Sequence, residues 1–380
     1  MFKPILRTLT TTTALAGLML ALGACNKAAD TAAPAAAPAA PAVVACDRAC
    51  LIGIVNSYVA AIVAHDPSKA PLAANVVFVE NVTKKKPGEG LWVDAVKAPG
   101  TFAITVPDEV THSIGYLAMM TRMAPPAAPP GSTPEQRDAA AKAAPTEQPV
   151  MVAMRLKLDD SGKIVEAEHL LAGINPAIAE AGKPPTTFDN LQVLRPGILT
   201  DIPAEQRLPH DKLIAIGATY YDALDDNNGE LAPFAADCER HENGMITASG
   251  NPSPAPAIPG APPANPKAPK VAPVARDCKG QLNSGTFQYI DRIENRRVFA
   301  ADPQTGLVMG LSHFRHPMDN LPYKVTHVDG STTETTKETF KFDPFDLPAG
   351  HIFKIGADGQ MHEIEAMGFM APYNSPTGWE

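Results

Sequence analysis

An internal repeat constrains the fold of this chain more than any other feature. Residues 51–81 align without a gap on residues 213–243, and 11 of the 31 positions are identical. Two shorter matches follow in the same order, 100–102 with 285–287 and 156–168 with 353–365. Chance or shared composition could produce one such match, but three in the same order indicate duplication. Because the repeat is far longer than a solenoid unit, we predict two tandem domains rather than a repeat array.

Both copies have the same predicted order of secondary structure. Each begins with apolar residues at helical spacing, at 51–62 and at 213–224. Short apolar or alternating segments then predict strands between Gly, Pro and Asp turns. These strands are predicted at 76–82, 102–106, 113–120, 150–158 and 164–171 in the first copy and at 238–243, 287–290, 307–314, 351–355 and 361–368 in the second. We therefore expect an α+β fold of two tandem units, each an N-terminal helix packed on a curved antiparallel sheet.

Proline-rich segments divide the predicted units. The 39 prolines cluster in a few stretches, which is typical of loops and linkers rather than of packed elements. The expected organisation is a first copy at 46–175 with an insertion at 123–149, a linker at 176–207, and a second copy at 208–380 with a proline-rich insertion at 249–275.

The N-terminus has the pattern of a bacterial lipoprotein signal. Lys3 and Arg7 precede an apolar stretch at 14–22, and Gly23-Ala24 stand before Cys25. We expect residues 1–24 to be a signal peptide and Cys25 to carry lipid. The alternative is an ordinary export signal that is cleaved at a nearby small residue.

The segment after Cys25 predicts a tether. Residues 25–45 are mostly Ala, Pro and Thr, a composition that favours extended chain over a packed core. Asn26 after the cysteine resembles the sorting pattern of the outer membrane. The predicted location is the bacterial cell envelope, anchored by lipid and facing the periplasm or the exterior.

Four cysteines remain besides Cys25: Cys46, Cys50, Cys238 and Cys278. An even number in an exported protein suggests two disulfides, for which three connectivities exist. The spacing of Cys46 and Cys50 suits a bond between them, which leaves Cys238 to Cys278. A zinc site is the alternative, but the chain has no Cys-x-x-Cys pair and its histidines are scattered, so no metal is expected.

Charge and missing motifs exclude several classes of function. The formal net charge is -9, whereas nucleic acid selects for basic surfaces, so we expect no nucleic-acid partner. The sequence has no phosphate-binding glycine-rich loop, serine-hydrolase elbow, zinc-protease helix or dinucleotide fingerprint. We therefore expect no cofactor, and a small-molecule ligand as the partner besides the membrane.

Several motifs of the second copy are similar to a known family. They are Pro233 to Gly244, Ser284-Gly285-Thr286-Phe287 with Tyr289, Asp291-Arg292, Arg296-Arg297, His316-Pro317, Pro372-Tyr373 and Gly378-Trp379. The pattern resembles an uncharacterised family of secreted fungal and bacterial proteins, similar to the nuclear-transport-factor-2-like superfamily with its polyketide-cyclase and ketosteroid-isomerase folds. The resemblance covers 208–380 and, more weakly, 46–172.

This resemblance implies a cone-shaped α+β unit with a pocket between the helix and the concave sheet. Such folds host isomerases, cyclases, dehydratases and lyases as well as binding or dimerising domains, so the fold does not assign an activity. It also implies that the two copies could pack together as an intramolecular pseudo-dimer.

Polar side chains on strands or on the helix are the candidate site residues. The acid/base candidates are His241, Glu242, His313 and Tyr220, and the substrate-binding candidates are Asn243, Arg297 and His316. A buried carboxyl or imidazole can exchange protons near neutral pH, and an arginine can hold an anion. Each residue also fits a structural role. For the acid and amide at 242 and 243, the recurrence of the same pair at 80 and 81 favours that role. The histidines at 241 and 313 have no counterpart in the first copy, so we expect the working pocket in the second.

The sequence is compatible with two functions. One is a cofactor-free lyase, isomerase or hydrolase, and the other is a non-catalytic envelope lipoprotein that binds a ligand or a protein. The enzyme hypothesis requires His241, Glu242 and His313 to converge on one cavity.

Overall fold

The computed structural model describes residues 46–126, 128, 133–174, 188–250 and 277–380. These residues belong to one compact unit that spans 43–380. The predicted signal peptide, Cys25 and the tether lie outside the described residues, as do 176–187 of the predicted linker and 251–275 of the proline-rich insertion. None of the described helices is long and apolar enough to cross a membrane.

The first half is a seven-stranded sheet with one long helix. Its elements are α1 Arg48–Val63, β1 Leu72–Glu80, β2 Thr83–Lys85, α2 Leu91–Asp94, β3 Ala95–Lys97, β4 Ala103–Asp108, β5 Ser113–Ala124, α3 Pro134–Ala141, β6 Thr146–Leu158 and β7 Ile164–Gly173. The strand order is β2-β1-β7-β6-β5-β3, and β4 also pairs with β5. All pairs are antiparallel except β1 with β7.

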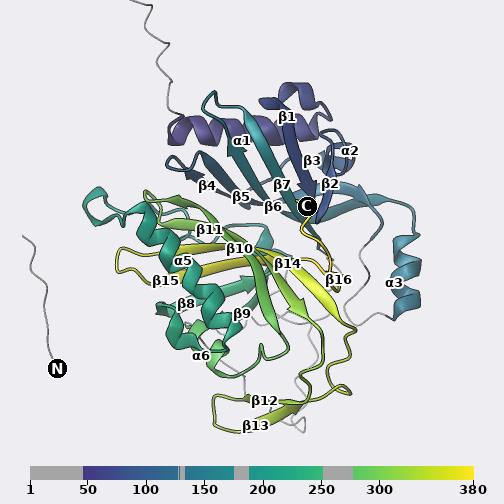
Figure 1. The fold of residues 1–380 in the computed structure, drawn as a ribbon, viewed down its shortest axis with the longest axis vertical. Coiled ribbons are helices and arrows are strands. Elements are labelled where there is room, and N and C mark those ends of the chain that lie inside the picture. Colours follow the sequence, from purple (N-terminus) through teal and green to yellow (C-terminus); the bar gives the residue numbers. More distant parts are fainter. Residues whose placement is uncertain (1–45, 127, 129–132, 175–187, 251–276) are drawn as a thin grey trace, which may run out of the picture. The chain divides into compact units, whose positions relative to one another are not determined.

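The second half repeats this strand order. Its elements are α5 His210–Asp225, β8 Phe234–Glu242, β9 Met245–Ser249, α6 Cys278–Asn283, β10 Arg292–Asp302, β11 Leu307–His316, β12 Tyr323–Thr326, β13 Thr332–Thr335, β14 Phe345–Ile355, β15 Met361–Gly368 and β16 Ala371–Pro372. The order is β10-β11-β14-β15-β8-β9, with β16 beside β14 and a separate β12–β13 hairpin. Here β8 and β15 form the parallel pair. In Figure 1, α1 lies across the first sheet and α5 across the second.

The expected mixed α+β fold is therefore confirmed as two large, mostly antiparallel sheets with few helices. One predicted strand is wrong, because 287–290 forms a turn after α6 and the strand begins later, at Arg292. Gly285 has a φ of 75°, and the Ile290 N–H donates to the Phe287 carbonyl at 2.9 Å. These features close the backbone on itself, so its N–H groups do not enter the sheet.

The long helices begin and pack as their sequences dictate. Asp47 caps α1 by accepting the N–H of Cys50 at 2.9 Å. In α5, Leu213, Tyr220 and Leu224 are fully or almost fully buried against the sheet. Gly217 allows close approach, because a Cβ there would lie 2.9 Å from Val308.

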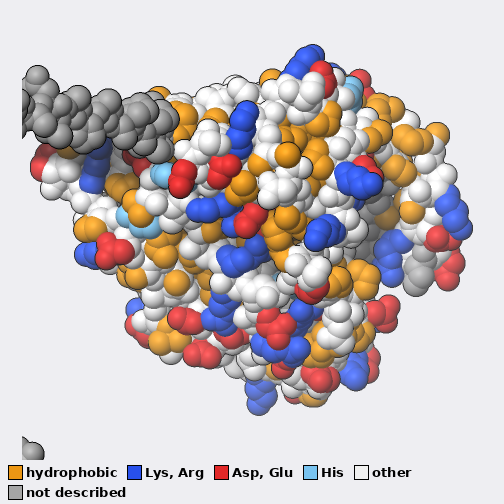
Figure 2. Space-filling view, turned by 45° about the horizontal axis from the view of Figure 1, so that its top comes forward, with side chains coloured by type: hydrophobic (Ala, Val, Ile, Leu, Met, Phe, Trp, Pro, Cys, Tyr) orange, Lys and Arg blue, Asp and Glu red, His pale blue; other side chains and the backbone are white. Residues whose placement is uncertain are grey.

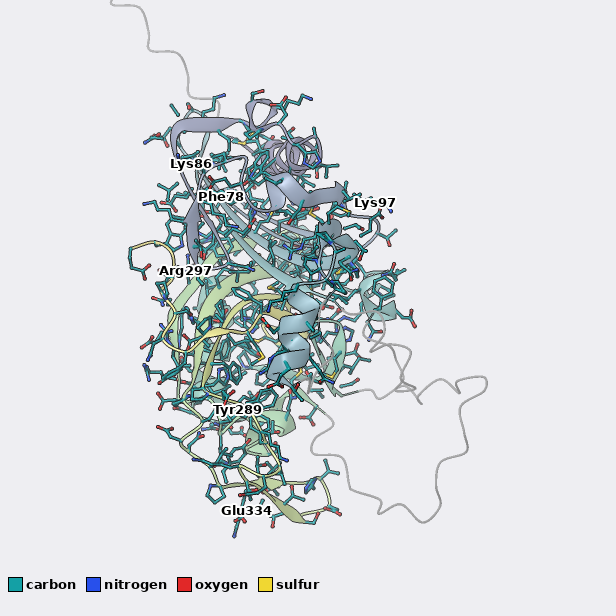
Figure 3. The ribbon with its side chains drawn as sticks, turned by 90° about the vertical axis from the view of Figure 1, so that its right-hand side faces the viewer. Phe78, Lys86, Lys97, Tyr289, Arg297 and Glu334 are labelled. Carbon is teal, nitrogen blue, oxygen red and sulfur yellow. A yellow bond between two sulfur atoms is a disulfide. The ribbon has the colours of Figure 1, made fainter. Side chains whose placement is uncertain are left out.

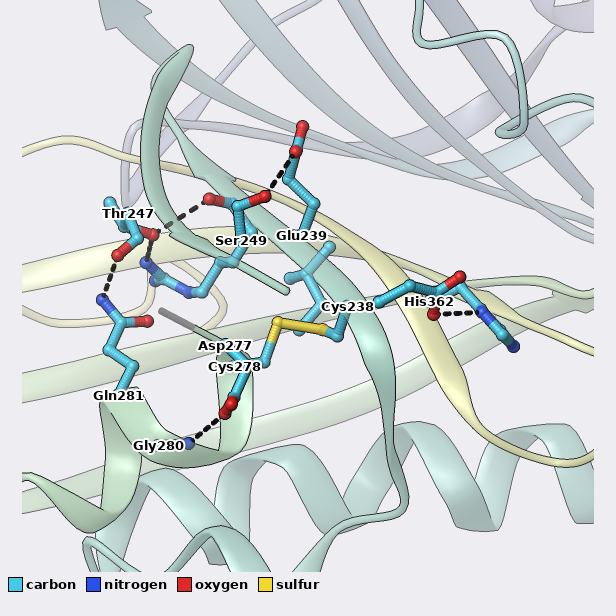
Figure 4. The surroundings of a disulfide bond; sticks show 12 residues. Cys238, Glu239, Thr247, Ser249, Asp277, Cys278, Gly280, Gln281 and His362 are labelled. Atoms are coloured by element: carbon cyan, nitrogen blue, oxygen red, sulfur yellow. Dashed lines mark hydrogen bonds and ion pairs between the residues drawn. A yellow bond between two sulfur atoms is a disulfide. The ribbon is translucent and has the colours of Figure 1, made fainter. Parts of the chain in front are cut away.

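Both predicted disulfides are present. Cys46 pairs with Cys50, and Cys238 pairs with Cys278. Figure 4 shows the second bond, which fastens α6 to β8.

Three hydrophobic clusters form the interior. One lies between α1 and the first sheet, and a second lies between α5, α6 and the second sheet. The third joins the outer faces of the two sheets and includes Leu117 and Met151 from the first and Met309 and Ile352 from the second. The two halves are thus packed sheet against sheet. On the face drawn in Figure 2, acidic and basic side chains are interspersed over the surface.

Candidate functional site

A small cavity lies in the second half, on the helix side of the sheet. Its volume is about 30 Å³, enough for a few water molecules. The wall comes from α5, β8, the turn after α6, and strands β11, β14 and β15. The lining residues are Leu224, Arg240, Glu242, Phe287, Tyr289, Ile290, Phe314, His316, Leu347, Ala349, His351, Ala366, Met367 and Gly368.

Arg240 is the central polar group of this cavity. Its side chain is buried, and its guanidinium donates to Tyr220 Oη at 2.8 Å, Thr247 Oγ1 at 2.7 Å and Glu242 Oε2 at 2.8 Å. It also lies over the ring of Phe287, 5.6 Å from the centroid. The cation is therefore already paired with Glu242, and each of its three nitrogens donates a hydrogen bond.

Two buried histidines complete the polar lining. Burial lowers the pKa of His316 to about 4, although the Asp346 and Glu242 carboxylates act in the opposite direction. Burial and the charge of Arg240 lower the pKa of His351 to about 3. Both imidazoles are accordingly neutral at pH 7.

The aromatic lining is built around His316. Its ring stacks on Phe345, with centroids 4.2 Å apart, and on Tyr289 at 5.3 Å. His316 Nδ1 is buried and has no hydrogen-bond partner in the part of the chain that the structure describes.

Three of the predicted site residues belong to this cavity. Glu242 and His316 line it, and Tyr220 reaches it through its hydrogen bond to Arg240. Burial raises the pKa of Tyr220, although the nearby Arg240 lowers it, so the phenol stays protonated at neutral pH.

His241 lies on the opposite face of the sheet. As the sequence alternation requires, it points away from Glu242, its neighbour in β8. Its Nε2 lies 2.7 Å from Glu239 Oε1, and its Nδ1 lies 3.5 Å from Glu365. Arg195 binds the same two carboxylates at 3.4 and 2.9 Å. His241 is thus part of an ionic cluster that joins the linker to the sheet.

Arg297 and His313 also face away from the cavity, toward the first half. Arg297 binds Glu168 through both guanidinium nitrogens, at 2.6 and 2.8 Å. Both residues line a separate pocket of about 10 Å³. Figure 3 shows Arg297 well separated from Tyr289, which lines the cavity. The predicted acid/base set is therefore split between two faces of one sheet and does not form a single site.

His313 has a serine and an aspartate nearby, but the three do not form a catalytic triad. Ser375 Oγ lies 3.0 Å from His313 Nε2 and 3.0 Å from Asp346 Oδ2, while that same Nε2 lies 3.5 Å from Asp346. In a triad, one ring nitrogen faces the serine and the other faces the acid. Arg315 also donates to Asp346 and to the Ser375 carbonyl. Burial and the charge of Arg315 lower the pKa of His313. The hydrogen bonds of His313, Arg315 and Asp346 to Ser375 hold the C-terminal segment against the sheet.

Asn243 has a structural role that is repeated in the first half. It adopts a φ of 47°, donates to the Gly368 carbonyl at 3.0 Å and accepts from the Gly368 N–H at 3.1 Å. Asn81 has a φ of 45° and makes the same two bonds with Leu171, at 3.3 and 2.7 Å. The amide at this position therefore ties the end of the first strand to the last strand of each sheet.

The first half contains a buried analogue of the Tyr220–Arg240–Glu242 chain. Tyr58 Oη lies 3.0 Å from His169 Nε2, and His169 Nδ1 lies 3.4 Å from Glu80 Oε2. Phe78 occupies the position of Arg240, so the nitrogen comes from the neighbouring strand instead. All three polar residues are at most 3% exposed, which makes this chain part of the core.

Arg240 and His351 line the cavity but are not among the residues predicted from the sequence. Arg240 could have been found, because it lies two residues before Glu242 and strand alternation places both on one face. His351 gave no signal, since its position depends on how β14 pairs. No group of histidines, cysteines and acids that could hold a metal ion is found within the described ranges.

The comparisons with known proteins concern the second half. Residues 206–368 match a family model described as "Domain of unknown function (DUF8021)". No curated protein matches the chain. The chain is thus similar, over the half that contains the cavity, to a domain whose description assigns no activity.

Proposed function

We propose that this protein is an exported lipoprotein, anchored through Cys25 in the bacterial cell envelope, whose second half binds a small, uncharged, planar molecule. The observation that carries the proposal is the cavity beside Arg240, which has aromatic walls and no unpaired charge. The lipoprotein pattern at residues 1–25 supports the location, with the outer membrane favoured.

The polar lining favours an uncharged ligand. Arg240 is paired with Glu242, and the pKa values of His316 and His351, about 4 and 3, leave both rings neutral at pH 7. A charged ligand would lose its hydration and gain no ionic partner in return. A neutral ligand with one hydrogen-bonding group could instead use the unpaired Nδ1 of His316.

The aromatic walls favour a flat ligand. Phe287, Tyr289 and Phe314 line the cavity together with His316, and flat rings stack well on such surfaces. Because the cavity is only about 30 Å³, a ring can enter only if the wall moves. The segment at 336–344, between β13 and β14, is the part best suited to move, since it lies outside the sheets and Phe340 covers Tyr289 there through a ring contact.

The finer architecture that we propose is two tandem cone-shaped units of the nuclear-transport-factor-2-like type, each a helix over a curved sheet. The shared strand order and the packing of α1 and α5 on their sheets support this proposal. In the first unit, the hydrogen-bonded residues Tyr58, His169 and Glu80 are buried on the helix side of the sheet. This unit would then support the second.

Three ring compounds of similar size test the binding proposal. Benzyl alcohol, benzoate and benzylammonium differ chiefly in charge at pH 7. We expect saturable binding of benzyl alcohol by isothermal titration calorimetry, with at least tenfold weaker binding of both ions. Failure of all three to bind would contradict the proposed function, and preference for an ion would contradict the charge argument.

A matched pair of variants locates the binding. Ala349 lines the cavity and is 2% exposed, whereas Ala218 lies on the exposed face of α5. Ala349→Met should fill the cavity and abolish binding, and Ala218→Met should leave it unchanged. Equal effects would show that the ligand binds elsewhere.

Catalysis is the second candidate function, as a cofactor-free lyase, isomerase or hydrolase. It is favoured by Glu242 and His316, an acid and an imidazole that line the same cavity. Turnover of envelope metabolites by the mature chain should then fall in Glu242→Gln and persist in His313→Ala, whose imidazole faces the other pocket. Unchanged turnover in Glu242→Gln would remove that residue from the mechanism.

A further inference from the structure

Equivalent residues of the two halves meet each other where the sheets pack. Gly115 and Met309 are the third residues of β5 and β11, the strands that correspond in the two sheets. A Cβ on Gly115 would lie 2.6 Å from Met309 Sδ. Ala153 and Gly350 are each the sixth residue from the end of β6 and β14, and a Cβ on Gly350 would lie 2.9 Å from the Ala153 Cβ.

Contacts between equivalent residues are the mark of a two-fold, self-complementary interface. In a homodimer, a residue near the symmetry axis contacts the same residue of the other subunit. Here the equivalent residues of the two halves make such contacts within one chain. In an exact two-fold dimer, a contact away from the axis occurs twice, with the halves exchanged.

Such an exchanged pair of contacts is present. Arg48 is the first residue of α1, and its Nε and Nη2 donate to Asp302 Oδ2 at 3.1 and 3.0 Å. His210 is the first residue of α5, and its Nε2 lies 2.7 Å from Asp108 Oδ2. Asp108 and Asp302 are the last residues of β4 and β10, which form hairpins with the corresponding strands β5 and β11. The helix start of each half therefore reaches the hairpin of the other half.

The two aspartates also shape the turns that follow them. Asp108 accepts the N–H of Val110 at 2.9 Å and of Thr111 at 2.8 Å, and Asp302 accepts the N–H of Gln304 at 3.0 Å. Asp108 and Asp302 are 0% and 2% exposed. A buried carboxylate that loses a hydrogen-bond partner is costly, so the side chain supplied by the other half supports each turn.

We propose that, across this interface, the helix start of each half holds the hairpin turn of the other half in shape. The interface is independent of the ligand cavity, so this inference goes beyond the proposed binding function. Arg48 lies inside the Cys46–Cys50 loop, at the start of the described chain. Its contact with Asp302 therefore links the segment that follows the tether directly to the second half.

Hydrogen exchange of the full chain tests the crossed arrangement. Arg48→Met should speed exchange of the Gln304 and Gly306 amides at least tenfold and leave the 108–113 hairpin unchanged. His210→Leu should have the opposite pattern, with faster exchange at 108–113 only. A variant that changed the hairpin of its own half, or neither hairpin, would overturn the proposal.

Two further variants keep the test decisive. Lys97→Met removes an ion pair with Glu147 inside the first half, where both side chains are at least half exposed, and should change neither hairpin. If Arg48→Met does not fold, Arg48→Lys keeps the charge without the two-nitrogen contact. It should then show a smaller increase confined to 302–307, and equal increases in both hairpins would contradict the proposal.

Discussion

The Cys238–Cys278 disulfide should support both the stability of the protein and the shape of its cavity. It joins β8 to α6, and α6 leads directly into the turn at 284–290 that forms one cavity wall. Replacing both cysteines with alanine removes this link without leaving a buried free thiol. The matched control is the same replacement of Cys46 and Cys50, far from the cavity in sequence.

Loop length sets the expected difference between the two disulfides. The sequence separation is 40 for Cys238–Cys278 and 4 for Cys46–Cys50. The chain-entropy relation then gives a loss of about 4 kcal/mol for the first bond and about 2 kcal/mol for the second at 25 °C. The first replacement should therefore lower the free energy of unfolding about twice as much as the second.

Urea unfolding measures these losses, and calorimetry with benzyl alcohol measures the cavity. The variant without Cys238–Cys278 should also bind benzyl alcohol more weakly, because α6 and the following turn lose their anchor. The variant without Cys46–Cys50 should bind normally. Equal losses of stability would contradict the dependence on loop length, and unchanged affinity in the first variant would show that the disulfide does not shape the cavity.

Three further predictions concern single side chains. Burial lowers the pKa of His316 to about 4, below the usual ~6.5, so the unfolded chain is protonated first and stability falls between pH 6.5 and 4. In urea titrations at several pH values, His316→Phe should reduce this loss of unfolding free energy by about 3 kcal/mol. An unchanged dependence of the free energy of unfolding on pH would contradict this. Asn243→Ala should lower the free energy of unfolding by about 2 kcal/mol, because two hydrogen bonds to Gly368 are lost at a residue with a positive φ. Asn243→Gly should lower it less, and equal losses would contradict a contribution from the positive φ. Tyr220→Phe should lower the free energy of unfolding by about 2 kcal/mol, because the charged Arg240 loses the hydroxyl that accepts its hydrogen bond. An unchanged free energy of unfolding would show that this hydrogen bond does not stabilise the protein.

The order of elements and the disulfide pairing were predictable from the sequence. Apolar spacing identified α1 and α5, and most strands lie within a few residues of their predicted bounds. The charged strand β10 was missed because its polarity resembles that of a loop. Two of its arginines bond distant partners: Arg296 bonds Asp222 and Asp225 of α5, and Arg297 bonds Glu168 of the first half.

The site was only partly predictable, for a geometric reason. Alternation correctly separated His241 from Glu242, but it cannot tell which face of a strand lies beneath the helix. That depends on which strands pair and on what covers each face. In the first half, likewise, the side chain that links Tyr58 to Glu80 is His169 on the neighbouring strand and not the residue at position 78.

Binding of a small neutral ring in the cavity of the second half can be followed by nuclear magnetic resonance of the chain with labelled histidines during a titration with benzyl alcohol. We expect saturable shifts of the ring signals of His316 and His351, which line the cavity, while those of His241 and His313 on the other face stay unchanged. No saturable shift at His316 and His351, or a larger shift at His313, would contradict binding in this cavity.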